Sequence, residues 1–219
     1  MTVNHEVIKL QQQNNAILLC VLKQKNTSLA SKWLKEFKGS AYDPKVDMKD
    51  CLEHVAVLDS DEKNIYQWIL HLEEYNQWLQ EEKSSILDIE LQTPPTSLNN
   101  PVSFNSALVA TTLRSTDQFP VLAFFCRHRN LKSSSMDNAS PVALVKSLTG
   151  QLLRFIVEHR PFIDLSPLEN QKLFLKARTD LNNGLLLLDT LLSSLPRDDM
   201  VFLIIDSLIP QGKRGEKGH

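Results

Sequence analysis

Glycine is scarce in the sequence, and its distribution excludes one common type of site. Only 6 of the 219 residues are glycine, and none lies between Gly39 and Gly150. Lysine is likewise missing between Lys83 and Lys132. A loop that wraps a triphosphate needs glycines for close backbone approach and a lysine for the phosphate charge. The middle of the chain therefore cannot supply such a loop, and we do not expect an enzyme that hydrolyses ATP.

Cysteine pairs, long apolar runs and excess charge are also missing. Cys20, Cys51 and Cys126 are far apart in the sequence, so neither a disulfide framework nor a zinc site is predicted. No segment approaches the about 18 apolar residues of a membrane span, and Ala16–Leu22 lacks the flanks of a secretory signal. The net charge of −2 indicates neither nucleic acid nor an anionic membrane as partner. We expect a cytoplasmic protein with no metal and no cofactor.

The most informative stretch is Val201–Asp206, five apolar residues that end in a carboxylate. A short apolar run bounded by polar and turn residues is typical of a parallel strand that is buried on both faces. An aspartate at the carboxyl end of such a strand lies where open α/β sheets bind ligands. In nucleotide hydrolases the equivalent aspartate holds magnesium.

Two further strands are predicted at Ser85–Leu91 and Val121–Cys126, and Arg127–Ala139 is predicted as a polar surface loop. Apolar periodicity and capping residues predict the helices Glu6–Lys23, Leu29–Phe37 (capped by Ser28 and ended by Gly39), Asp61–Glu82 (capped by Ser60), Phe104–Arg114, Pro141–Glu158 (capped by Ser140), Pro167–Thr179 and Leu185–Leu195. Strands that alternate with helices imply a parallel sheet. The predicted organisation is a helical region over residues 1–83, an α/β domain over 84–208 and a flexible tail over 209–219.

Four segments, in this order, resemble the nephrocystin-like modules of the NACHT (STAND) P-loop ATPases, which are common in filamentous fungi. They are the Trp-rich stretch Trp68–Trp78, the strand end Phe124-Phe125-Cys126, the helix from Pro141 through Gln151-Leu152-Leu153, and the closing element from Leu195-Pro196 to Asp206. The resemblance covers roughly residues 50–208. It implies an incomplete parallel sheet of the P-loop NTPase type, flanked by helices.

The resemblance also shows what this chain has lost. The best placement of the family's phosphate loop is Asn99–Ser106, where Asn105 replaces the lysine and only Ser106, the expected magnesium ligand, remains. Asn99, Asn105, Ser106 and Asp206 are thus vestigial nucleotide-binding positions. Residues after Asp206 offer no base for catalysis.

Two functions stay open at this stage. The first is a non-catalytic, truncated module that binds a protein partner through its amino-terminal helices, or through a sheet edge exposed at Ser85–Leu91 where the family places a later strand. The second is residual nucleotide binding, in which Ser106 and Asp206 share magnesium and Arg127 or Arg129 meets phosphate. His128 is interpreted as part of a solvated loop, and the isolated His54 and His71 do not indicate a metal site.

Overall fold

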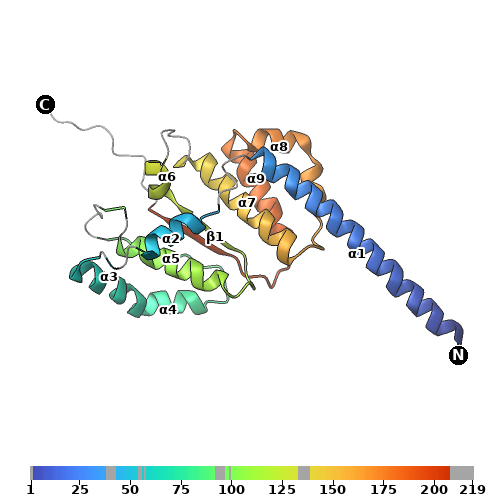
Figure 1. Ribbon diagram of the computed structural model, residues 1–219, viewed down its shortest axis with the longest axis horizontal. Coiled ribbons are helices and arrows are strands. Elements are labelled where there is room, and N and C mark those ends of the chain that lie inside the picture. The colour runs from blue at the N-terminus through green and yellow to red at the C-terminus, as the bar shows by residue number, and fades with distance from the viewer. Residues whose placement is uncertain are drawn as a thin grey trace. The chain divides into compact units, whose positions relative to one another are not determined.

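The computed structural model describes residues 2–37, 43–53, 56, 58–91, 97–98, 100–132 and 139–207. The chain forms two compact units, each built from two segments of the sequence (Figure 1). Unit 1 contains Met1–Tyr42 and Ser140–Met200, and unit 2 contains Asp43–Ala139 and Val201–His219. The continuous domain boundaries expected near residues 83 and 208 remain predictions.

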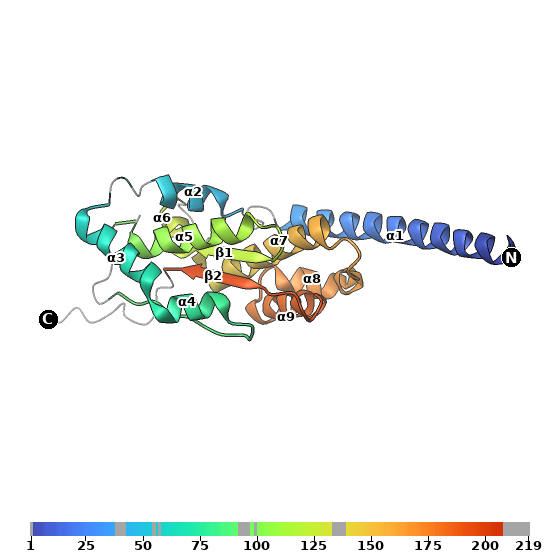
Figure 2. The ribbon, with the colours of Figure 1, turned by 90° about the horizontal axis from the view of Figure 1, so that it is seen from below.

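Unit 2 contains a parallel sheet of the two strands β1 (Val121–Phe125) and β2 (Phe202–Asp206). Val121 pairs with Phe202, and Phe125 pairs with Asp206, so the two carboxyl ends lie side by side. Both strands were predicted, and their parallel pairing confirms an α/β fold. Figure 2 shows the two arrows together, with helix α5 (Pro101–Arg114) running along them.

Helix α5 and helix α2 (Lys45–Glu53) form the core of unit 2 with the strands. The buried core residues are Met48, Cys51, Ala107, Ala110, Val121, Ala123, Phe125 and Ile204. Burial on both faces is correct for β1 but wrong for β2, where Leu203 is 49% exposed. Among the described residues β2 pairs only with β1, so its other side is an edge of the sheet.

The predicted strand Ser85–Leu91 is wrong. These residues have no regular secondary structure, and Ile86 is 97% exposed. The run alternates acidic and apolar residues, which suits a strand only when a neighbouring strand supplies hydrogen bonds. In the described part of the chain the unpaired edges of the sheet belong to β1 and β2 and not to this segment.

The single helix predicted over Asp61–Glu82 is two helices, α3 (Ser60–His71) and α4 (Glu73–Gln80). Leu72 between them has extended backbone angles, with φ −62° and ψ 131°. The Leu72 carbonyl accepts hydrogen bonds from both the Asn76 amide (3.2 Å) and the Asn76 side chain (2.9 Å) at the start of α4. The cap of α3 is Asp59 and not Ser60, because Asp59 and Glu62 form a reciprocal capping box.

The polar loop predicted from Arg127 is also wrong over its first part. Helix α6 (Cys126–Lys132) follows β1 directly, and residues 133–138 lie outside the described part. His128 is 0% exposed and Arg129 is 7% exposed, so neither belongs to a solvated loop. The Arg129 guanidinium lies 4.9 Å from the centre of the Phe124 ring, and this tertiary contact holds a polar segment in place.

Unit 1 contains the helices α7 (Pro141–His159), α8 (Gln171–Ala177) and α9 (Leu181–Ser193) and the 3₁₀ helix η3 (Ser166–Glu169), with α7 and α8 both packed against α9. The start of α7 was predicted correctly, since Ser140 accepts a hydrogen bond from the Ala143 amide and Pro141 occupies the first turn. The helix predicted over Pro167–Thr179 is divided at Asn170, which caps α8. Helix α9 is capped by Asp180 and begins at Leu181, four residues before the predicted start at Leu185.

Helix α1 (Thr2–Glu36) replaces the two helices predicted before residue 38. Ser28 does not cap a helix, and Gly39 lies outside the described residues. Asn26 is 2% exposed and donates hydrogen bonds to the carbonyls of Pro161 (2.9 Å) and Ile163 (2.6 Å). These hydrogen bonds to partners within unit 1 stabilise the helix at Asn26, where the neighbouring residues are polar. No helix in the described part of the chain combines the length and apolar character needed to cross a membrane.

Candidate functional site

The candidate site lies at the carboxyl end of β2, where the Asp206 side chain meets the first turn of α5. Asp206 is 2% exposed. Its Oδ2 accepts hydrogen bonds from the hydroxyls of Ser103 (2.9 Å) and Ser207 (3.0 Å). Its Oδ1 is buried and has no hydrogen-bond donor among the described residues. The Asp206 carboxylate therefore lies at the carboxyl end of the parallel strands, as predicted.

The amino terminus of α5 is closed by Asn100. The Asn100 Oδ1 accepts hydrogen bonds from the amides of Val102 and Ser103, both at 3.1 Å, and Nδ2 donates to Ser103 Oγ at 2.9 Å. Pro101 occupies the first helical position and has no N–H to offer. A phosphate bound at a helix amino terminus uses these backbone amides. Here the chain's own side chain already occupies two of them.

Burial controls the ionisation of the groups around this site. It raises the pKa of the Asp206 carboxyl above its ordinary value. The hydrogen bonds from Ser103 and Ser207 and the positive charge of Arg127 lower this pKa, but their effect is smaller than that of burial. Burial likewise raises the pKa of the Cys126 thiol to about 11, and the negative charge of Asp206 adds to the rise. Cys126 is therefore a thiol at neutral pH and not a nucleophilic thiolate.

The predicted site residues are only partly brought together. Asn99 lies outside the described residues. Asn105 is buried in α5, where its Nδ2 donates to the Pro101 carbonyl at 3.0 Å. Ser106 is half-buried in the same helix, but the hydroxyl that contacts Asp206 is that of Ser103. The segment expected to form a degenerate phosphate loop is helical from Pro101 onward.

Sequence reasoning missed Asn100 and Ser103, although a signal was present. An asparagine followed by proline and then by an apolar helical pattern is a typical helix start, with Asn as cap and Pro in the first turn. Applied to Asn100-Pro101, this rule starts the helix three residues before Phe104. It would also have shown that Ser103 lies in the first turn.

We expect Asn100→Ala to lower the free energy of unfolding by about 1 kcal/mol, within a range of about 0.5–2 kcal/mol. The variant loses the oxygen that accepts from two backbone amides. Urea denaturation followed by circular dichroism measures the change, and Asn100→Ser should retain more of the stability because its hydroxyl oxygen keeps an acceptor without adding a buried charge near Asp206. Equal losses in the two variants would contradict the capping role.

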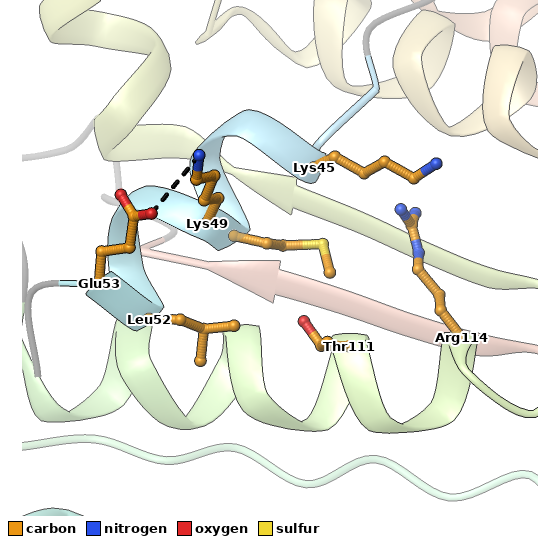
Figure 3. A pocket seen from close by; sticks show the side chains of 7 residues that line it. Lys45, Lys49, Leu52, Glu53, Thr111 and Arg114 are labelled. Carbon is orange, nitrogen blue, oxygen red and sulfur yellow. Dashed lines mark ion pairs between the residues drawn. The ribbon is translucent and has the colours of Figure 1, made fainter.

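A separate cavity of about 400 Å³ lies between α2 and α5 (Figure 3). Its lining combines three cations and one acid with small or apolar side chains: Lys45, Met48, Lys49, Leu52, Glu53, Thr111 and Arg114. Lys49 pairs with Glu53 at 3.5 Å, and Arg114 donates to the Val121 carbonyl at 2.9 Å. These cations already have partners in the fold, and the cavity offers no arrangement specific for phosphate.

Comparison with known families identifies the chain. The family model described as Nephrocystin 3, N-terminal, matches residues 64–208. The chain belongs to the nephrocystin 3 N-terminal family. The match begins inside α3 and ends just after β2, so it contains Ser103 and Asp206 but not α1. Searches of curated proteins and of solved structures gave no match.

Proposed function

We propose that this chain is a non-catalytic member of its family that acts as an interaction or regulatory module. The observation that carries the proposal is the closed amino terminus of α5. In a P-loop hydrolase the helix amides and the strand-end aspartate would face phosphate and magnesium. Here Asn100 occupies the amides of Val102 and Ser103, and the Ser103 hydroxyl occupies Asp206 Oδ2.

The proposed contact surface is the amino-terminal half of α1. Residues 6–21 of this helix are all exposed, and they include several large apolar side chains. Seven of these are at least 42% exposed: Val7, Ile8, Leu10, Ile17, Leu18, Leu19 and Val21. Clusters of exposed apolar side chains on a soluble protein commonly mark protein-binding surfaces. This surface supports a protein partner more directly than the sheet edge does.

A titration with a fluorescent ATP analogue and magnesium tests the non-catalytic part of the proposal. We expect no saturable binding at micromolar concentrations. The alternative function, residual nucleotide binding through Ser106 and Asp206 with magnesium, has one observation in its favour, the buried Oδ1 of Asp206 without a donor. Saturable binding that Asp206→Ala abolishes would overturn the proposal and support this alternative.

The interaction part is tested by changing the surface of α1. A partner captured by the wild-type chain should bind the double variant Leu10→Glu and Ile17→Glu at least about tenfold more weakly, because two apolar contacts are lost. The double variant Gln12→Glu and Gln13→Glu adds the same charge at exposed polar positions of the same helix and should bind as wild type. Equal weakening by both variants would indicate an effect of charge alone.

A further inference from the structure

Three side chains able to bind a metal ion converge within unit 2, and none of them takes part in the hydrogen bonds of Asp206 Oδ2. Asp47 and Asp50 are three residues apart on α2, so they project from one side of the helix. His128 comes from α6. One donor atom from each of the three residues lies within 4.8 Å of the others. Asp47 and His128 are both 0% exposed, whereas Asp50 is partly exposed.

A fourth side chain sets the orientation of the imidazole ring. Cys51, the residue after Asp50, places its Sγ atom 3.2 Å from His128 Nε2. This contact holds the imidazole ring beside α2, the helix that carries both carboxylates. A neighbouring group that fixes a histidine ring in this way orients it as a metal ligand. Cys51 is 2% exposed, which excludes a role for this Cys–His pair as a nucleophile for an external substrate.

The charges around the cluster favour a cation. Asp47 and Asp50 supply two carboxylates in a largely buried place, where negative charge is costly unless it is compensated. The Arg129 guanidinium contributes one positive charge, with its Nε 3.8 Å from Asp47 Oδ2. A divalent ion would bring positive charge to both carboxylates, and the partial exposure of Asp50 offers a path of entry.

We propose that Asp47, Asp50 and His128 form a zinc site. Two carboxylate oxygens and an imidazole nitrogen are ligands that Zn²⁺ binds at about 2.0–2.2 Å, and Mg²⁺ or Ca²⁺ would prefer oxygen alone. In the tetrahedral geometry of zinc sites, ligand atoms at these distances lie about 3.3–3.6 Å apart. The three donor atoms lie within 4.8 Å of one another, so the side chains would move closer together around the ion. Bound zinc joins α2 to α6, the helix that directly follows β1, and so holds α2 against the carboxyl end of the strand.

The test uses the full chain freed of metal with a chelator and then titrated with ZnCl₂. We expect the wild-type chain to retain one Zn²⁺ per molecule after desalting and to unfold at a higher temperature with zinc than without. His128→Gln and Asp50→Asn should lose both the retained zinc and the thermal shift. Asp50→Asn changes a partly exposed residue, so it tests the site even if the buried His128→Gln variant does not fold. Cys51→Ser should weaken binding by about 10- to 100-fold, as expected when a group that orients a ligand is changed.

Matched controls separate this site from general zinc binding. Glu53→Gln removes an exposed acid from the same helix, and His71→Gln removes an exposed histidine of α3. Both variants should retain zinc and the thermal shift as wild type does. The proposal is wrong if the wild-type chain retains no zinc, or if folded Asp50→Asn and wild type show the same zinc content and the same thermal shift.

Discussion

Replacing Trp33 with alanine is expected to lower the free energy of unfolding by about 3–5 kcal/mol, the usual cost of removing a buried aromatic side chain. Trp33 is 2% exposed at the carboxyl-terminal part of α1. Its ring centre lies 4.2 Å from that of Phe174 and 5.6 Å from that of Phe37, both in edge-to-face arrangements. Its Nε1 donates a hydrogen bond to the Leu168 carbonyl at 3.0 Å. The substitution therefore leaves a cavity and an unpaired buried acceptor together.

A second substitution of Trp33 separates the hydrogen bond from the ring contacts, and a substitution at Trp68 serves as control. Trp33→Phe keeps most of the ring contacts but removes the N–H, so it should cost about 1–3 kcal/mol. Trp68→Ala is the matched control, because Trp68 is 56% exposed and its loss should change stability by no more than about 0.5 kcal/mol. Urea denaturation followed by far-ultraviolet circular dichroism avoids the changed fluorescence of the variants. Similar losses for Trp33→Ala and Trp68→Ala would contradict the packing described here.

The Trp33 contacts also bear on the proposed function. They hold the carboxyl-terminal half of α1 to the other helices of unit 1, so the exposed amino-terminal half continues from a fixed helix. Lys25 and Glu169 add an exposed ion pair at 2.7 Å, which contributes little by comparison. A variant that unfolds this packing should therefore lose partner binding even though it leaves the apolar residues of the contact surface unchanged.

The elements that could be predicted from sequence are those that local signals specify. The apolar runs Val121–Cys126 and Val201–Asp206 predicted both strands, and Ser140-Pro141 predicted the start of α7. The break at Leu72 has neither glycine nor proline to mark it, so the apolar stripe continued through it. The strand predicted at Ser85–Leu91 failed because alternation of side chains cannot show whether a partner strand is present.

In the candidate site, too, the part that local signals specify could be predicted from the sequence and the tertiary contacts could not. The position of Asp206 follows from the strand alone. Its contact with Ser103 depends on where α5 begins and on how that helix lies against the sheet, and the second condition is tertiary. The burial of His128 is likewise a tertiary effect, because α2 and α6 are far apart in the sequence and polar composition alone predicted a loop.

Ser103→Ala is expected to lower the free energy of unfolding by about 1.5–3 kcal/mol, the range for a hydrogen bond to a charged group. The substitution leaves buried Asp206 with the Ser207 hydroxyl as its one remaining donor among the described residues. Ser106→Ala is the matched control in the same helix and should change stability by no more than about 0.5 kcal/mol. A larger loss for Ser106→Ala than for Ser103→Ala would contradict the contact of the Ser103 hydroxyl with Asp206.

The loss caused by Ser103→Ala should also depend on pH. Because the pKa of Asp206 is raised in the folded chain, the folded state binds this proton more tightly than the unfolded state, whose pKa is about 3.9. The contribution of Asp206 to stability therefore falls as pH rises above that value. Removing the Ser103 hydroxyl takes away a bond that favours the carboxylate, so it raises the pKa further and enlarges the penalty at neutral pH. Denaturation at several pH values between about 4 and 8 should show a loss that grows with pH and becomes independent of pH in the Asp206→Asn background. A loss that is constant over this range in the wild-type background would show that Ser103 does not act through the charge of Asp206.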